Sequence, residues 1–274
     1  MKIIMNNFIV FHIVLTTGLY SQTFEVKPLP KVLNETSGLE SLNGYYLTHN
    51  DSGNPSSLFG IDLDGNILFE RKYSELKNVD WEDLTRDSQF LYVADTGNNF
   101  DAREDLRILK FDLHTLHYVG TINFRYSVQA SFEINTITEF DAEAIINIEN
   151  NLVLFSKNRR FKNTQLYKIP KELGSYGLEK FGEIDSELII TGGDFSPELE
   201  LLILTGTKDF KEYYIQLYEG FTLTTLEYKR KRTTLIPFDS LQVEAVKIID
   251  HRNFLVTSES ENDSKLPKLI KISF

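Results

Sequence analysis

Short apolar runs separated by polar turns dominate the chain. The runs are rich in Ile, Leu, Val, Phe and Tyr, and Asn, Asp and Gly punctuate them. Several runs alternate apolar and polar residues, as in Arg107–Phe111 and Gln165–Ile169. Alternation with this composition is typical of β-strands that bury one face. The pattern therefore predicts an all-β protein.

The runs are organised in five similar segments. Each segment opens with a short acidic or hydroxyl motif, continues through an apolar run and a polar loop, and then reaches an alternating strand. The openings recur at intervals of 45, 61, 51 and 50 residues, which is the length of a four-stranded propeller blade. The opening motifs are Ser37–Leu39, Glu82–Leu84, Glu143–Ile145, Asp194–Ser196 and Glu244–Val246.

The two ends of the chain together supply the missing part of the last segment. After Glu244 there is room for only three strands, and the stretch before Ser37 holds one strand at Phe24–Lys27. We expect this amino-terminal strand to complete the last blade and close the ring, because closure removes exposed sheet edges. The sequence predicts a single five-bladed β-propeller. A six-bladed ring is the alternative, and it would need a blade without a recognisable motif.

The first 21 residues have the pattern of an export signal. Lys2 gives the positive start, Phe8–Leu15 is an apolar stretch too short to span a bilayer, and Leu19–Ser21 precedes the expected cleavage. A buried first strand or an uncleaved anchor is the alternative. We predict a signal peptide at 1–21 and a propeller domain at 22–274, exported to the periplasm or the extracellular space.

Composition narrows the classes of partner. The chain has 29 Lys and Arg against 40 Asp and Glu, a net charge of -11, so it is a poor nucleic-acid binder. It contains no Cys, which excludes disulfides, thiolate metal sites and cysteine nucleophiles. No later segment is apolar enough for a membrane span. We expect a monomer whose loops bind a small molecule or a protein.

Carboxylates stand at the start of the strands that should line the channel. Four of them, Glu82, Glu143, Asp194 and Glu244, belong to the opening motifs. Like charges around a narrow axis either raise their own pKa values or hold a cation between them. Oxygen ligands without Cys favour Ca²⁺, with Mg²⁺ as the second choice. The alternative is that these carboxylates cap strands and hold water.

A second polar set follows the strands that return to the same mouth of the channel. His49 is the best placed of the five His to act as a general base, although a hydrogen-bonded loop histidine is the commoner situation. Two segments of this set, Asn50–Asn54 and Asp95–Asn99, favour tight turns first and ligand loops second. The predicted ligand-binding residues are Asn50, Asp51, Asp95, Asn98, Lys157, Arg159 and Glu259.

Taken in order, these motifs resemble a largely uncharacterised family of exported bacterial propeller proteins. The motifs that carry the resemblance are Ser37–Leu39, Thr48–Asn54, Asp80–Leu84, Asp95–Asn99, Asp141–Ala144, Thr191–Pro197 and Glu244–Ala245. More distantly the plan is similar to gluconolactonase-like proteins, esterase-like phytase domains and calcium-activated nucleotidases. The distant resemblance implies a Ca²⁺ in the channel, with Glu82, Glu143, Asp194 and Glu244 as its ligands.

Two functions from different classes follow. The first is a binding or scaffold module in which the ion joins the blades and the loop face recognises a ligand. The alternative is a calcium-dependent hydrolase of a phosphoester, ester or lactone, in which the metal would polarise the scissile group and activate water. We place binding first, because the sequence identifies no acid–base pair.

Overall fold

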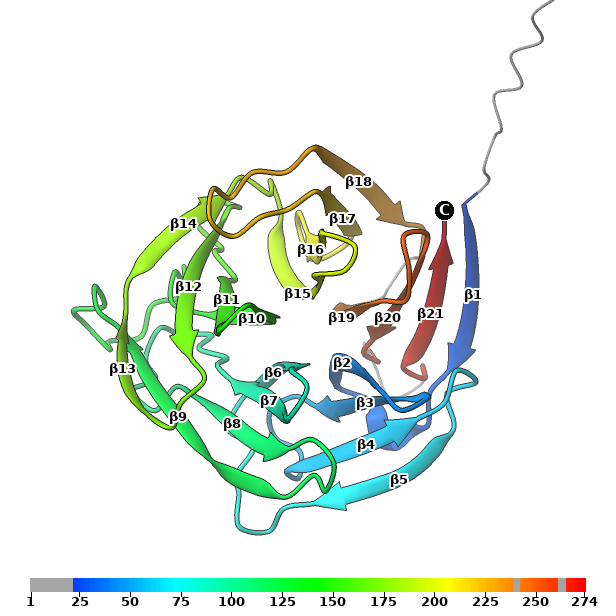
Figure 1. Ribbon diagram of the computed structural model, residues 1–274, viewed down its shortest axis with the longest axis horizontal. Coiled ribbons are helices and arrows are strands. Elements are labelled where there is room, and N and C mark those ends of the chain that lie inside the picture. The colour runs from blue at the N-terminus through cyan, green and yellow to red at the C-terminus, as the bar shows by residue number, and fades with distance from the viewer. Residues whose placement is uncertain (1–21, 239–241, 261–264) are drawn as a thin grey trace, which may run out of the picture.

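The computed structural model describes residues 22–238, 242–260 and 265–274. They form five sheets arranged in a ring around a central axis, as Figure 1 shows. Each sheet is a blade whose first strand lies innermost. The prediction of an all-β, five-bladed propeller is confirmed. The predicted signal peptide lies outside the described residues.

The blades follow one another along the chain, and the strands of each are named from the inner strand outward. Blade 1 contains β2 (Thr36–Leu42), β3 (Tyr45–Asn50), β4 (Ser57–Ile61) and β5 (Ile67–Lys72). Blade 2 contains β6 (Trp81–Arg86), β7 (Phe90–Asp95), β8 (Arg107–Asp112) and β9 (Tyr118–Tyr126). Blade 3 contains β10 (Ala142–Ile148), β11 (Asn151–Ser156), β12 (Thr164–Pro170) and β14 (Lys180–Ile184).

The last two blades complete the ring. Blade 4 contains β15 (Ile189–Ser196), β16 (Leu201–Thr207), β17 (Tyr213–Glu219) and β18 (Arg230–Ile236). Blade 5 contains β19 (Val243–Ile248), β20 (Asn253–Ser258), β21 (Lys268–Ser273) and β1 (Thr23–Pro28). The 3₁₀ turn η1 (Lys31–Leu33) follows β1. Among the described residues, no helix is long and apolar enough to cross a membrane.

The amino-terminal strand closes the ring as the sequence predicts. β1 pairs antiparallel with β21 from Thr23 opposite Ser273 to Pro28 opposite Lys268. Figure 1 shows the two strands side by side at the outer edge of blade 5. Because the first and last described strands share one sheet, closure depends on backbone hydrogen bonds between segments far apart in sequence.

Blade 2 has a fifth strand that the repeat pattern did not predict. β13 (Gly174–Leu178) leaves the connection between β12 and β14 and pairs parallel with β9, the outer strand of blade 2. Blades 2 and 3 are therefore joined by backbone hydrogen bonds at the rim as well as by side-chain packing.

In the described part of the chain the core consists of five apolar clusters, one between each pair of neighbouring blades. Strand alternation explains this arrangement, because successive side chains point to opposite faces of a sheet. In β7, Leu91 and Val93 pack towards blade 1, whereas Tyr92 and Ala94 pack towards blade 3. The single Trp, Trp81, is fully buried between blades 1 and 2.

Candidate functional site: the acidic mouth of the channel

The inner strands of neighbouring blades run in the same direction around the channel. Near the strand starts, the hydroxyl of Thr191 donates to the Val243 carbonyl of the next blade at 2.6 Å, and Ser37 donates to the Glu82 carbonyl. Near the strand ends, the Ile248 N–H donates to the carboxylate of Asp194 at 2.8 Å. The strand starts therefore meet at one mouth of the channel, and the strand ends meet at the other.

A β-bulge lies near the start of the inner strand in every blade. In blades 2 to 5 the bulge leaves one residue without a directly opposed partner on the second strand: Glu82, Glu143, Thr191 and Glu244, respectively. In blade 1 the register shifts between Ser37 and Glu40. A bulge bends the strand and re-aims the extra side chain. The acidic motif repeated in the sequence thus marks the bulge in three of the five blades.

Two overlapping groups of carboxylates gather where the strands begin. Asp51, Asp80 and Glu82 offer oxygens that lie within 4.8 Å of one another, and Glu82, Asp141 and Glu143 form a second such group. Asp51 follows β3, whereas Asp80 and Asp141 directly precede β6 and β10. Glu82 belongs to both groups and joins them. We call this end of the channel the acidic mouth.

The donor set of the acidic mouth fits a hard divalent cation. Ca²⁺ binds oxygens at about 2.3–2.6 Å, so two oxygens on one ion lie at most about 5 Å apart. The oxygens of each group meet that limit. The groups contain no nitrogen or sulfur ligand, which is the chemistry of Ca²⁺ and Mg²⁺ sites rather than of zinc sites.

Burial and mutual repulsion raise the pKa values of four carboxyls at the acidic mouth, Asp51, Asp80, Glu82 and Glu143. For Glu82, burial is the largest cause of a pKa well above the usual value, and the charges of Glu143, Asp51 and Asp80 add to the effect. Burial, followed by the nearby Asp80, raises the pKa of Asp51 to about 8. Burial and then Glu244 raise the pKa of Glu259 to about 10. Too few positive charges surround these carboxyls, and a bound cation would supply the missing charge.

Two basic side chains lie inside the cluster and are paired. Lys157 is buried, and its Nζ lies 2.5 Å from Oε1 of Glu143. Burial lowers the pKa of Lys157, but Glu143 and Glu244 raise it more, so the ammonium stays charged. Arg159 Nη1 lies 2.5 Å from Oδ2 of Asp141. The carboxylates nevertheless outnumber these cations.

Glu244 lies in the same charged network but outside the two close groups. Its charge acts on the titration of Glu143 and Lys157, and burial raises its own pKa. Glu82, Glu143 and Glu244 of the four predicted ligands therefore lie at the acidic mouth, and the first two lie close enough to share an ion.

Asp194 lies at the other mouth of the channel. Its carboxylate accepts hydrogen bonds from Lys247 Nζ at 2.9 Å and from the Ile248 N–H at 2.8 Å. The repeat pattern in the sequence matched Asp194 with Glu143, whereas Thr191 occupies the bulge position of blade 4. The sequence pattern selected Asp194 because it is the nearest acidic residue to the bulge, and the bulge residue of blade 4, Thr191, carries no charge.

The lack of a side chain at Gly97 leaves space for two carboxylates of the acidic mouth. Gly97 lies in the turn after β7, and a Cβ atom there would collide with Oε1 of Glu82 and Oδ2 of Asp80. The sequence predicts a tight turn at Asp95–Asn99. The structure adds a second reason for a glycine at this position, because the turn passes directly against two members of the cluster.

Three of the predicted ligand-binding residues hold loops in place. Asp95 is fully buried and pairs with Arg103 at 2.9 Å and Arg107 at 2.8 Å. Asn98 accepts from the Arg103 N–H and donates through its own N–H to Asp141. Asn50 donates through Nδ2 to a backbone carbonyl at 2.7 Å. Asn98 thereby orients Asp141, a member of the acidic mouth.

His49 is a fully buried side chain between blades 1 and 2. Its ring packs edge-on against Trp81, with ring centroids 5.6 Å apart, and Nδ1 lies 3.1 Å from the Asn50 carbonyl. Burial lowers its pKa to about 4. The contacts of His49 are with the backbone and with Trp81, so the described geometry gives it no carboxylate partner at the acidic mouth.

Comparisons with known proteins support the fold and go no further. No protein-family model and no curated protein matches the chain. The PQQ-bound aldose sugar dehydrogenase of Streptomyces coelicolor aligns over 92% of this chain and 98% of its own, at 10% identity and a TM-score of 0.53. A Bacteroides fragilis protein described as exported aligns over 92% and 95%, at 11% identity and a TM-score of 0.44. At such identities the likeness is one of fold alone.

Proposed function

We propose that the acidic mouth binds a divalent cation, Ca²⁺ before Mg²⁺, and that the protein is an exported binding propeller. The observation that carries the proposal is the pair of carboxylate groups that share Glu82. Isolated acidic side chains on a surface need no ion. Buried carboxyls within 4.8 Å of one another need either protons or a cation to offset their repulsion.

An ion in the first group would connect blades 1 and 2, and an ion in the second group would connect blades 2 and 3, with Glu82 common to both groups. Asp51 comes from blade 1, Asp80 and Glu82 from blade 2, and Asp141 and Glu143 from blade 3. Ca²⁺ accepts six to eight oxygens in a flexible geometry, whereas Mg²⁺ demands an octahedron and keeps several waters. Carboxylates that come from loops and from inner strands of separate blades suit the more flexible ion. Binding would thus hold the strand starts of these blades together.

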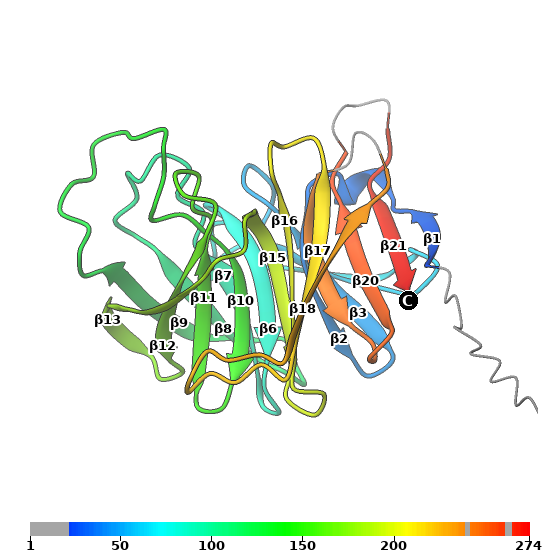
Figure 2. The same ribbon diagram turned by 90° about the horizontal axis from the view of Figure 1, so that it is seen from above.

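The loops around the acidic mouth would then form the recognition surface for a small molecule or a protein. In Figure 2 the long connection between β9 and β10 projects from this side of the disc, above the blades. Arg159 and Arg160 lie at its base, where they pair with Asp141 and Glu139. A rigid ring with polar loops at one mouth is the usual arrangement of a binding propeller.

We place binding ahead of hydrolysis of a phosphoester, ester or lactone because of His49. A general base must reach its proton through a direct or water-mediated hydrogen bond. His49 is fully buried and its pKa is lowered to about 4. A hydrolase would therefore have to use a carboxyl of the acidic mouth as its base.

Calorimetric titration with CaCl₂ tests the proposal. We expect about one Ca²⁺ per chain, and we expect Glu82→Gln to weaken binding at least tenfold, because the substitution removes the ligand shared by both groups. Glu198→Gln is the matched control, since Glu198 is exposed and lies at the other mouth. Absence of binding by the wild type, or equal weakening by both substitutions, would reject the site.

Hydrolysis is tested in the same preparation. A phosphoester, an ester and a lactone are offered to the calcium-loaded protein and to Glu82→Gln. Turnover by the wild type that Glu82→Gln abolishes would favour the hydrolase, whereas calcium binding without turnover supports the binding role.

A further inference from the structure

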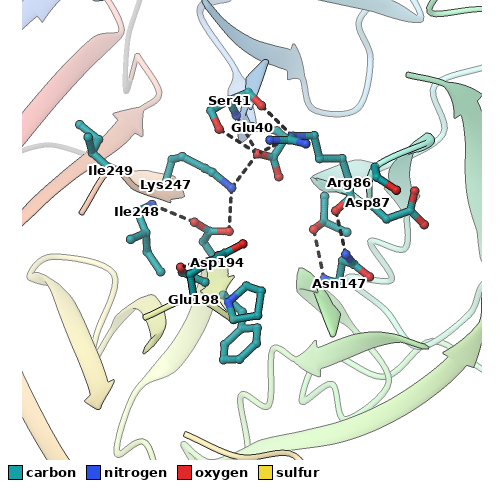
Figure 3. Close-up of a pocket in the computed structure, with 15 residues that line it drawn as sticks. Glu40, Ser41, Arg86, Asp87, Asn147, Asp194, Glu198, Lys247, Ile248 and Ile249 are labelled. Atoms are coloured by element: carbon teal, nitrogen blue, oxygen red, sulfur yellow. Dashed lines mark hydrogen bonds and ion pairs between the residues drawn. The ribbon is translucent and has the colours of Figure 1, made fainter. Parts of the chain in front are cut away.

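A cavity occupies the other mouth of the channel, where the inner strands end. Its volume is about 440 Å³, within the range of small-molecule sites. All five inner strands contribute to its wall, and Figure 3 shows their side chains converging from around the ring. None of the acidic-mouth carboxylates lines it. We call this end the paired mouth, and its central residues are Glu40, Arg86, Asp194 and Lys247.

The charges of the four central residues of the paired mouth balance one another. Lys247 Nζ lies 2.6 Å from Oε1 of Glu40 and 2.9 Å from Oδ1 of Asp194, as Figure 3 shows. Arg86 Nε lies 3.5 Å from the same oxygen of Glu40. Two carboxylates therefore face two cations. Asp87 and Glu198 also line the cavity. The carboxylate of Asp87 accepts the N–H groups of Gln89 and Phe90 and lies 3.4 Å from Lys171 Nζ. Glu198 is exposed to solvent and accepts a hydrogen bond from the Ser196 hydroxyl, so neither carboxylate belongs to the buried central set.

Hydrogen-bonding groups remain unused beside these pairs. Arg86 donates through Nε to the Ser41 carbonyl at 2.8 Å, and within the described chain its two terminal nitrogens have no partner. Glu40 is buried, and its hydrogen bonds and ion pairs all use Oε1, so Oε2 accepts nothing from the described residues. The cavity thus presents spare donors on Arg86 next to a spare acceptor on Glu40.

A hydroxyl group satisfies both kinds of spare group at once, because it donates one hydrogen bond and accepts others. A neutral ligand also keeps the charge balance, whereas an anion or a cation would leave one charge uncompensated in a mostly buried site. Phe195, Pro197 and Ile248 add apolar surface to the wall, against which the C–H face of a ring can pack. We propose that the paired mouth binds a neutral polyhydroxylated ligand, a sugar of one or two rings.

Sugar binding at the paired mouth does not depend on the cation site, since the two sets of residues are separate. Calcium binding can fail while sugar binding succeeds, and the reverse can also occur.

The test is calorimetric titration of the wild-type protein with glucose, galactose, mannose, xylose, maltose and cellobiose, each up to about 50 mM, a range that detects even weak dissociation constants. We expect at least one sugar to bind. Arg86→Gln should weaken that binding at least tenfold, because it removes the two free donors. Arg160→Gln, at an exposed arginine beside the acidic mouth, should leave the affinity unchanged.

Ser196→Trp is a second variant that keeps the test decisive if Arg86→Gln folds poorly. Ser196 lies in the cavity wall at the end of β15, so an indole there should fill the space and abolish binding. Glycine and inorganic phosphate serve as charged probes. Binding of either probe in place of every sugar, binding of no sugar at all, or sugar binding that survives both Arg86→Gln and Ser196→Trp would overturn the proposal.

Discussion

Buried carboxylates lie at both mouths of the channel, but their negative charges are compensated in different ways. At the paired mouth, Lys247 lies between Glu40 and Asp194, and each carboxylate has a cation within 3 Å. At the acidic mouth, Lys157 and Arg159 each take one carboxylate, and Glu82, Asp51 and Asp80 repel one another. At the paired mouth the protein itself supplies the compensating positive charge, whereas the acidic mouth needs protons or an added cation. Charge count alone therefore separates a structural ion pair from a candidate metal site.

Removing the cation of the paired mouth should produce the largest effect. Lys247→Met removes the cation that lies between two buried carboxylates: Asp194 keeps only the hydrogen bond from the Ile248 N–H, and Glu40 keeps Arg86 at 3.5 Å and the Ser41 N–H. We expect the free energy of unfolding to fall by about 3–5 kcal/mol. Urea denaturation measures the loss. Lys180→Met is the control, because Lys180 is exposed and pairs only at the surface, and it should cost less than about 0.5 kcal/mol. A loss as small as that of the control would mean that the paired mouth is not held by this ion pair.

Removing one carboxylate should have opposite effects at the two mouths. In the absence of divalent cations at pH 8.5, Asp194→Asn should lower the free energy of unfolding by about 1–3 kcal/mol, since it weakens charge-assisted hydrogen bonds. Glu82→Gln should raise it by about 1 kcal/mol, because a neutral amide needs neither the proton nor the cation that a buried carboxyl with a raised pKa requires at this pH. Urea denaturation of both variants in chelator measures the two changes. Changes of the same sign would break the contrast between the mouths.

The pH dependence of stability sharpens the contrast further. The folded protein holds a proton on Asp51 up to about pH 8, whereas the unfolded chain releases it near pH 4. The stabilisation is therefore complete below the unfolded pKa and is lost as the pH rises through about 8. With chelator we expect the free energy of unfolding to fall between pH 6.5 and 8, by up to about 1.4 kcal/mol per pH unit for each extra proton held.

His49 acts with the opposite sign below about pH 6.5. Its pKa is lowered to about 4, so the unfolded chain takes up a proton that the buried ring does not, and stability falls as the pH drops from about 6.5 to 4. Above pH 6.5 the carboxyls determine how the free energy of unfolding changes with pH. Saturating Ca²⁺ should flatten that slope, and Asp51→Asn should reduce it. A slope unchanged by either would contradict the assignment.

The ring was predictable because its signals are local and repeated. Alternating strands recur at blade length, and the acidic motif marks the bulge at Glu82, Glu143 and Glu244. The closing strand followed from the room left at the two ends of the chain. The addition of β13 to blade 2 was not predictable, because parallel pairing between neighbouring blades leaves no periodic trace in the sequence.

The candidate site was predictable in part. Three of the four acidic motifs lie at the mouth where the carboxylates gather. The bulge residue of blade 4 is Thr191, which carries no acid, so the repeat pattern led to Asp194 at the other mouth. Asp95 and Asn98 were predicted from residue type, although the same types stabilise turns, and both lie in such contacts. The paired mouth was not predictable because Glu40, Arg86 and Lys247 come from strand interiors and ends that show no shared motif.

The most direct test of the calcium site is the metal content of the purified protein, measured together with its melting temperature with and without a chelator. We predict about one calcium per chain and a fall in melting temperature on the order of 10 °C on chelation, because an ion that binds only the folded state stabilises it by mass action. Glu82→Gln should contain no calcium and show no fall. A wild-type protein without metal, whose melting temperature the chelator and added Ca²⁺ both leave unchanged, would contradict the central claim.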